Sequence, residues 1–377
     1  MKIGFFTDTY TPQINGVVTS IESYRKELEK RGHLVFVFAP TPKQKKDSKK
    51  IIRFPSVKFI FQPEMRIALP YSLEALRLLE KIKLDIIHSQ DPFSIGLFGL
   101  WMAKKFKIPY VHTYHTLYPE YVHYIWETRL TKKIAKRLSK DFCNQCDLVV
   151  APSTKIKKYL KLWGVKKPLE ILPTGIELDE FKIDLGAVAN FREKYKILTQ
   201  EKILIFVGRL GKEKNIELLI KSLKLIKTPG VKLLIIGDGP HKPKLQSLIK
   251  KEGFENKVSL TGYLPRKEVV AALRASKIFV FSSKTETQGL VVAEAMAAGL
   301  PVVAVSDLAI ADMVKDKKNG FLVKSSAREM AKKIDKLLTN QKLYGRMSRA
   351  SKNLAKNFSA EKQTKKLEKI YQGLLKK

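Results

Sequence analysis

The sequence predicts an α/β protein with two doubly wound domains, each built on a parallel sheet covered by helices. Short apolar runs of strand length alternate with longer amphipathic stretches, and the alternation occurs as two separate series. The length of 377 residues suits two domains that each bury their own core. In such sheets ligands bind beyond the carboxyl ends of the strands, so we expect the chemistry in the loops that follow them.

The first series covers residues 2–151. Its strands are apolar runs, expected at 2–7, 34–39, 86–89, 110–113 and 148–151. Its helices space apolar residues three and four apart, expected at 17–31, 72–82, 93–106 and 128–142. Strands that alternate with helices in this way imply βαβ units and therefore a parallel sheet.

Residues 164–201 interrupt the rhythm with Pro168, the turn at 173–175 and a group of acidic residues, so we expect a connector there. The strands of the second series are expected at 203–207, 231–236, 258–260, 278–281 and 301–304. Its helices are expected at 216–226, 242–251, 266–275 and 290–297. A basic amphipathic helix at 361–375 ends the sequence.

Charge is the unusual feature of the composition. Lys and Arg number 72 against 36 Asp and Glu, a formal net charge of +36 that is spread over both halves of the chain. This predicts a polyanionic partner, either nucleic acid, anionic lipid headgroups or a phosphorylated small molecule. The hydrophobic content of 44% is ordinary for a globular protein, and no uncharged stretch reaches the ~18 apolar residues of a spanning helix. The start of the sequence, residues 1–8, meets a charge at Asp8 too early for a signal peptide.

Two glycine-containing loops follow expected strands and open expected helices. In the first, Asn15-Gly16 precedes the helix at 17–31, where backbone N–H groups could approach a phosphate; an ordinary tight turn would use the same residues. In the second, Arg209 and Lys214 could hold a diphosphate, Arg by its fork and Lys as a point charge. The second loop lacks the pattern of a Walker loop.

The most informative motif pairs Glu286 with Glu294 across Gly289. Glu286 follows the strand at 278–281, and Glu294 lies two turns along the next helix. Two carboxylates that flank free N–H groups can bind two sets of sugar hydroxyls. The alternative is a capped helix with an exposed Glu, but Glu294 lies in an apolar run where an unpaired carboxylate is costly.

Histidine and cysteine also cluster, without the spacing of a metal site. Three of the six histidines lie in 112–123, where no acidic partner has ligand spacing, so we expect a single histidine to meet a substrate and His123 to be structural or part of the acceptor wall. The pair Cys143 and Cys146 has no second pair for zinc and no redox context, so it more plausibly closes a helix. Two cysteines also indicate a reducing compartment.

Together and in this order, these motifs resemble the retaining family-4 glycosyltransferases of the GT-B architecture, across essentially the whole chain. Within that group, segments 7–10, 15–18, 114–116 and 284–290 are similar to the diacylglycerol glucosyltransferases, which move an α-glucosyl unit from UDP-glucose to a membrane glycerolipid. Two departures from the wider family, Asn15-Gly16 in place of two glycines and 306–312 in place of Gly-Gly-Glu, are shared by that subset.

The resemblance implies two Rossmann-like domains facing a central cleft. The acceptor and membrane-facing domain would be 1–176, with the helix at 360–377 crossing back to it, and the nucleotide-sugar domain would be 177–359. It also implies retention at the anomeric carbon by front-face attack, no metal or other cofactor, and a UDP-sugar as co-substrate. The oligomeric state is left open.

Site residues follow from the same resemblance. His115 would contact the transferring sugar, Glu286 its hydroxyls and Glu294 the ribose, while Arg209 and Lys214 neutralise the leaving diphosphate. The catalytic set is therefore His115, Glu286, Arg209 and Lys214. The residues expected to bind the donor lie in loops after strands or at helix starts: Gly16, Arg209, Lys214, Asp238, Gly262, Tyr263, Leu264, Glu286, Gly289, Leu290, Val291 and Glu294.

The stretch 128–140 predicts a membrane contact. It has no acidic residue, and Leu130, Ile134 and Leu138 form one apolar stripe, as in an interfacial helix; the alternative is a surface helix that packs this stripe on its own domain. The candidate membrane contacts are its six basic residues: Arg129, Lys132, Lys133, Lys136, Arg137 and Lys140. Tyr118, Tyr121, Tyr124 and Trp126 just before it suit the headgroup level. We therefore expect a cytoplasmic protein attached peripherally to the inner face of the membrane.

The sequence is also compatible with other functions. The basic excess suits a nucleic-acid-binding protein, although we find no known module of that class. A glycosyltransferase with GDP-mannose or UDP-galactose as donor, or with a polyprenyl-linked or soluble acceptor, would carry the same motifs.

Overall fold

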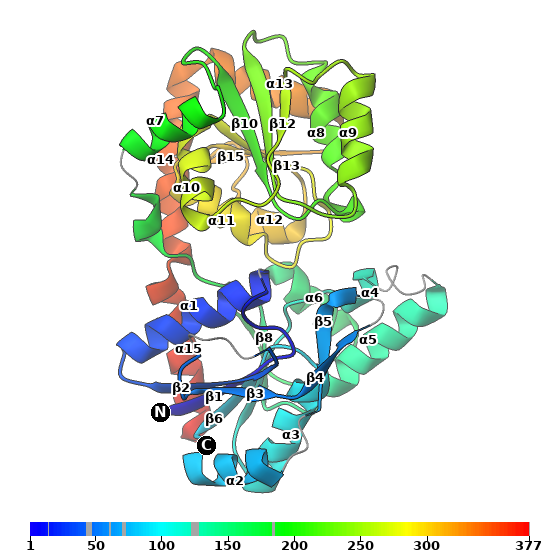
Figure 1. Ribbon diagram of the computed structural model, residues 1–377, viewed down its shortest axis with the longest axis vertical. Helices are drawn as coiled ribbons and strands as arrows, with labels where there is room; N and C mark the ends of the chain where they lie inside the picture. Colours follow the sequence, from blue (N-terminus) through cyan, green and yellow to red (C-terminus); the bar gives the residue numbers. More distant parts are fainter. Residues whose placement is uncertain are drawn as a thin grey trace. The chain divides into compact units, whose positions relative to one another are not determined.

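The chain forms two compact units (Figure 1). A computed structural model describes residues 1–13, 15–42, 47–59, 62–69, 73–121, 128–182 and 185–376. Unit 1 comprises Met1–Gly175 and Ala360–Lys377, and unit 2 comprises Ile176–Ser359. Within the described ranges, no helix combines the length and the apolar character needed to cross a bilayer.

Unit 1 is built on a seven-stranded sheet in the order β3-β2-β1-β6-β7-β8-β9. Each pair of neighbours is parallel. Its strands are β1 Lys2–Phe6, β2 Leu34–Pro40, β3 Ile51–Phe54, β6 Ile86–Ser89, β7 Tyr110–Thr113, β8 Leu148–Ala151 and β9 Leu169–Ile171. A separate antiparallel pair joins β4 Ser56–Phe59 to β5 Gln62–Ala68.

Helices cover both faces of this sheet. They are α1 Gly16–Lys30, α2 Leu73–Ile82, α3 Ser94–Phe106, α4 Tyr118–Tyr121, α5 Arg129–Cys143, α6 Thr154–Leu162 and α15 Ala360–Leu375. Alternate residues of β1 enter different cores, as the two-residue period of a strand requires. Ile3 and Phe5 pack in the core with residues of α1 and α15, whereas Phe6 packs in the core with residues of α3.

Unit 2 is built on a six-stranded parallel sheet in the order β12-β11-β10-β13-β14-β15. Its strands are β10 Lys202–Val207, β11 Val231–Ile236, β12 Val258–Leu260, β13 Ile278–Phe281, β14 Val302–Val305 and β15 Gly320–Val323. Its helices are η2 Leu178–Phe181, α7 Leu185–Lys194, η3 Lys212–Lys214, α8 Ile216–Leu223, α9 Lys242–Lys251, α10 Arg266–Ala275, α11 Leu290–Ala297, α12 Leu308–Met313, α13 Ala327–Thr339, α14 Gln341–Ala355 and η4 Lys356–Phe358.

The prediction of two doubly wound α/β domains is confirmed. The expectation that 164–201 is only a connector is wrong, because this stretch holds the edge strand β9 and the helix α7. The sequence pattern of both elements is weak, because β9 is three residues long and only Phe191 of α7 is buried. The strands β3 to β5, the helix α6 and the elements α12 to α14 were also not anticipated.

The last helix of the chain belongs to the first unit. Leu367 and Tyr371 of α15 are fully buried there, and the Tyr371 hydroxyl lies 2.6 Å from Nδ1 of His88 on β6. The other ring nitrogen of His88 lies 2.7 Å from the Thr113 hydroxyl. Burial lowers the pKa of His88 well below its usual range, so the ring is neutral and needs both partners.

We therefore predict that Tyr371→Phe destabilises unit 1. The substitution removes one hydroxyl and leaves Nδ1 of His88 buried without its partner, which costs about 1–3 kcal/mol. Urea unfolding followed by tryptophan fluorescence measures this, because the three tryptophans, Trp101, Trp126 and Trp163, all lie in the sequence of unit 1. The exposed Gln372→Ala on the same helix serves as control. Equal midpoints for all three proteins would contradict the prediction.

Candidate functional site

Both sheets reverse their strand order at one point. In unit 1 the chain leaves β1 toward β2 and β3 and then returns to place β6 on the other side of β1. In unit 2 the same reversal occurs between the neighbouring strands β10 and β13. The loops after two such neighbouring strands diverge and leave a crevice at the carboxyl edge of the sheet. In each unit we therefore expect a ligand to bind at this edge of the sheet.

An ion pair bridges this point in unit 2. Nζ of Lys214, in the loop after β10, lies 2.6 Å from Oε1 of Glu286, in the loop after β13. Only 16% and 11% of these two side chains are exposed. The hydroxyl of Ser282 donates to the carbonyl of Lys214 at 2.7 Å and ties the two loops together. Arg209 lies partly buried in the same loop as Lys214. The structure thus brings two of the predicted charges into direct contact.

The start of α11 lies in the loop region after β13. Gly289 has a φ of +82°, a left-handed conformation that favours glycine, and a Cβ there would lie 2.7 Å from Cδ1 of Ile310. Gly289 also has no side chain to cap the helix. The first-turn N–H groups, including those of Leu290 and Val291, therefore carry the positive end of the helix dipole without a capping side chain.

Glu294 lies farther along α11 and is only 5% exposed. This rules out the alternative of an exposed carboxylate. A guanidinium nitrogen of Arg266 donates to its Oε1 at 2.6 Å. Burial raises the pKa of Glu294, and Arg266 opposes that rise. Sequence reasoning missed Arg266, because nothing in its position at the start of a surface helix distinguishes it from the other basic residues.

The loops after β11 and β12 meet beside this region. The backbone N–H of Gly237 donates to the carbonyl of Gly262 at 2.9 Å. Asp238 pairs with Lys242 at 2.7 Å, and the hydrogen bond from Lys242 lowers the pKa of Asp238. Tyr263 is 65% exposed, whereas Leu264 is partly buried against the core. The predicted base-contacting loop is therefore joined through its backbone to the loop that carries Asp238.

Asn15 caps the helix that starts at Gly16 in unit 1. Its side-chain oxygen accepts hydrogen bonds from the N–H groups of Val17 and Val18, each at 3.0 Å. A Cβ added at Gly16 would meet no heavy atom within 4 Å. The surrounding protein therefore gives no steric reason for a glycine there.

Gln90 orients the predicted His115. Its side-chain oxygen lies 2.8 Å from Nε2 of His115, while its amide nitrogen donates to the carbonyl of His88 at 3.4 Å. With the amide oriented in this way, Nε2 of His115 carries the proton and Nδ1 is left as an acceptor. Burial lowers the pKa of His115 to about 4, so the ring is neutral at pH 7. Sequence reasoning missed Gln90, although it directly follows β6.

Two buried carboxyl groups meet at the reversal point of unit 1. Asp8 follows β1, and its Oδ1 accepts from the N–H of Ile95 at 3.0 Å. Asp91 follows β6, and its Oδ2 accepts from the Thr7 hydroxyl at 2.9 Å and the N–H of Asp8 at 3.1 Å. Burial and the nearby Asp8 raise the pKa of Asp91 to about 7. Neither residue was predicted from the sequence.

The apolar stripe of α5 does not pack on its own unit. Leu130, Ile134 and Leu138 are 65%, 48% and 64% exposed, which overturns that alternative. Among the basic residues of the helix, Arg129, Lys133, Lys136 and Arg137 are exposed, while Lys132 and Lys140 are half-buried. The hydroxyls of Ser139 on α5 and Tyr114 lie 2.9 Å apart and attach the opposite face of the helix to the unit.

Two further predictions concern the neighbourhood of α5. Cys143 and Cys146 are buried free thiols, and burial raises the pKa of Cys143 to about 12, so it stays protonated at neutral pH. Tyr118 packs edge-on against Phe93 and Tyr114. His123, Tyr124, Trp126 and the side chain of Tyr121 lie outside the part of the chain that the structure describes.

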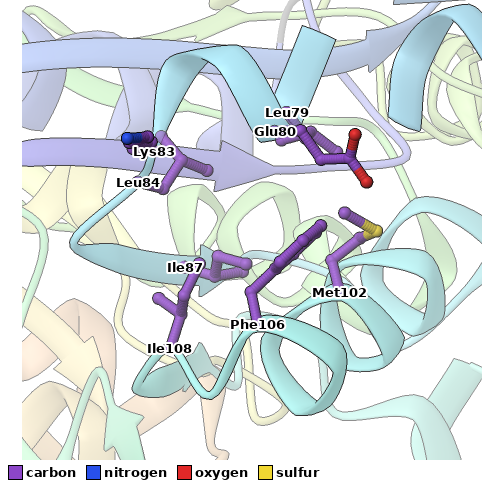
Figure 2. Close-up of a pocket in the computed structure, with 8 residues that line it drawn as sticks. All are labelled: Leu79, Glu80, Lys83, Leu84, Ile87, Met102, Phe106 and Ile108. Carbon is purple, nitrogen blue, oxygen red and sulfur yellow. The ribbon is translucent and has the colours of Figure 1, made fainter. Parts of the chain in front are cut away.

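A pocket of about 290 Å³ lies elsewhere in unit 1, between α2 and α3 (Figure 2). Its wall is mainly apolar: Leu79, Leu84, Ile87, Met102, Phe106 and Ile108, with Glu80 and Lys83 beside them. Leu84 and Ile108 come just before β6 and β7. The pocket therefore lies at the amino ends of these strands, away from the loops that carry the predicted residues.

We predict that Asp91→Asn changes how stability depends on pH. The pKa of Asp91 is about 7 in the folded protein and about 3.9 in the unfolded chain, so only the folded form holds its proton between these values. The free energy of unfolding therefore falls as the pH rises from about 4 to about 7. Asn is neutral throughout and escapes this loss, so the variant should gain about 1–4 kcal/mol relative to wild type between pH 5 and pH 8.

Thermal unfolding followed by tryptophan fluorescence at pH 5 and pH 8 measures this difference. Glu170→Gln on β9, an exposed carboxylate of the same unit, serves as control. A stability difference between Asp91→Asn and wild type that is the same at both pH values would contradict the raised pKa.

Two family models match the chain in sequence. "Glycosyltransferase Family 4" matches residues 14–180, and "Glycosyl transferases group 1" matches residues 188–354. A protein of Streptococcus pneumoniae named alpha-monoglucosyldiacylglycerol synthase is 38% identical over 330 residues, covering 85% of this chain and 75% of that protein. The Acholeplasma laidlawii protein of the same name is 32% identical over 394 residues, covering 100% of this chain and 98% of that protein.

A solved structure shares the fold of the whole chain. Sucrose-phosphate synthase from Thermosynechococcus elongatus superposes with a TM-score of 0.81 at 21% identity, covering 99% of this chain and 98% of that chain. The predicted family is thus confirmed by sequence and by fold. The chain belongs to the family-4 glycosyltransferases of the GT-B fold.

Proposed function

We propose that this protein transfers an α-glucosyl unit from UDP-glucose to a membrane glycerolipid such as 1,2-diacylglycerol, with retention at the anomeric carbon and without a metal ion. The observation that carries the proposal is the Lys214–Glu286 pair at the reversal point of unit 2, beside Arg209 and the start of α11. The names of the two relatives supply the substrate class.

Binding of the donor would separate Lys214 from Glu286 and give each of them a new partner. A diphosphate offers Lys214 a more highly charged partner than Glu286, and Arg209 adds bidentate hydrogen bonds. Glu286, released from Lys214, would then accept hydrogen bonds from hydroxyls of the sugar. Lys214 and Arg209 would also stabilise the charge that develops on the leaving diphosphate, the role of a divalent ion in other transferases.

Other residues would orient the rest of the donor. The N–H groups of Gly289, Leu290 and Val291 suit a phosphate oxygen, because they lie at the uncapped start of α11. We assign the ribose to Glu294, the base to the loop 262–264 and a lining role to Asp238. Gly16 is assigned to the diphosphate, which would account for a glycine that the protein atoms do not require.

His115 is proposed to contact the transferring sugar as a neutral ring. Its hydrogen bond to Gln90 leaves Nδ1 as an acceptor for a sugar hydroxyl, and its low pKa prevents it from carrying charge at pH 7. We propose front-face attack, in which the acceptor hydroxyl passes its proton to the leaving phosphate as the new glycosidic bond forms.

The helix α5 supports a membrane-bound acceptor. It combines an exposed apolar stripe with a basic surround, the pattern of a helix that lies in the headgroup region. Each basic group near an anionic surface contributes about 1 kcal/mol, so a few suffice for reversible attachment. We propose that α5 holds the protein peripherally on the cytoplasmic face of the membrane.

We predict glucosyl transfer that depends on vesicles. Full-length protein with UDP-glucose should form α-glucosyldiacylglycerol at least about tenfold faster on anionic vesicles containing diacylglycerol than on zwitterionic ones, because the charge of α5 concentrates the enzyme at the surface. Product analysis by mass spectrometry and anomeric assignment by NMR measure this, and EDTA should leave the rate unchanged. Turnover with GDP-mannose alone would contradict the donor, and equal rates without vesicles would contradict the membrane acceptor.

We further predict that the basic face of α5 controls attachment. Replacing Lys132, Lys133, Lys136 and Arg137 by Ser should lower the affinity for anionic vesicles by at least about tenfold, because four surface attractions of about 1 kcal/mol each are lost. Co-sedimentation with the vesicles measures this binding, and UDP affinity should be unchanged.

A matched variant removes the same charge from unit 2. Lys250, Lys251, Lys332 and Lys336 are exposed there, and their replacement by Ser should leave vesicle binding nearly intact. An equal loss in both variants would mean that the net charge of the whole chain, and not α5, attracts the membrane.

A further inference from the structure

Arg266 joins three elements of unit 2 at the candidate donor site. It is the first residue of α10, and its guanidinium donates to Glu294 on α11 at 2.6 Å and to Glu180 on η2 at 2.9 Å. The guanidinium carbon also lies 5.5 Å from the centre of the Phe181 ring. A planar fork held by two carboxylates and a ring has little freedom to rotate.

The two carboxylates depend on Arg266 to different degrees. The side chain of Glu294 is 7% exposed, whereas those of Arg266 and Glu180 are 43% and 41% exposed. Water can solvate Glu180 when Arg266 is absent, but it reaches Glu294 far less. Burial has the largest effect on the pKa of Glu294 and raises it. Of the charged groups that act on Glu294, Arg266 lowers this pKa and Glu180 raises it. Arg266 is thus the group that favours the ionised form of Glu294.

The contact leaves room for a ligand. An ionised carboxylate has about four acceptor positions on its two oxygens, and Arg266 uses one of them on Oε1. A vicinal diol can take two of the others. The contact therefore fixes the carboxylate without saturating it.

We propose that Arg266 is a positioning residue of the donor site, which holds the Glu294 carboxylate through Oε1 so that its remaining lone pairs accept hydrogen bonds from the two ribose hydroxyls. This rests on the proposed function, because it takes a nucleotide sugar as the ligand of unit 2. Arg266 itself needs no contact with the donor.

The test compares UDP with 2′,3′-dideoxy-UDP, which lacks both ribose hydroxyls, by calorimetry on the full-length protein. Wild type should bind UDP more tightly, and Arg266→Gln should reduce this preference about tenfold while leaving the affinity for dideoxy-UDP unchanged. Glu294→Gln should reduce it at least as much. Arg266→Lys should keep most of it, because the positive charge remains.

The pH dependence of the UDP preference distinguishes a positioning role of Arg266 from a role in packing alone. Without Arg266 the pKa of Glu294 rises further, so the UDP preference of Arg266→Gln should weaken as the pH falls from 8 to 6, while that of wild type changes less. At each pH the affinity for UDP is divided by the affinity for dideoxy-UDP, which cancels the effect of phosphate titration on binding. Lys267→Ala, an exposed neighbour on α10, should behave as wild type.

The outcomes distinguish the two proposals. If wild type does not prefer UDP over dideoxy-UDP, the ribose assignment of the proposed function fails and the role of Arg266 fails with it. If wild type shows the preference and Arg266→Gln retains it in full, or loses affinity for both nucleotides equally, the role of Arg266 alone is overturned.

Discussion

The reversal of strand order in each parallel sheet is the constraint on which the candidate sites depend. It makes the loops after β1 and β6, and those after β10 and β13, diverge at one edge of their sheets. Lys214 and Glu286 are 72 residues apart in sequence and meet only because those two loops flank the same point. The same geometry brings Asp8 and Asp91 together in unit 1.

Charge compensation inside the protein follows from this arrangement. Glu286 and Glu294 lie where water is scarce, and each has a basic partner, Lys214 or Arg266. A buried carboxylate without a partner would be costly, so the pairs stabilise the site before any ligand arrives. In the proposed function, the diphosphate of the donor replaces Glu286 as the partner of Lys214. The Arg266–Glu294 pair stays in place and Glu294 binds the ribose. Under the proposed function, the site therefore needs only a few of the many basic residues of the chain.

The sequence was sufficient for the fold class and for the loops that carry charge, because strands, helices and their order leave periodic patterns. Glu294 could be singled out because a carboxylate in an apolar helix contradicts its surroundings, and Glu286 because it follows an expected strand in the same motif. Arg266 and Gln90 could not, because their importance lies in which distant side chain they contact. The exposure of the α5 stripe also needed the structure: its spacing fits a buried face as well as a membrane-facing one.

Hydrogen exchange with mass spectrometry, with and without UDP-glucose, tests the central claim most directly. The account predicts that the donor protects backbone amides in 208–215 and 282–292, the loops after β10 and β13 and the start of α11. Amides near the pocket between α2 and α3 should exchange at the same rate in both samples. Protection confined to that pocket, or absent from the two loops at a saturating donor concentration, would contradict the account.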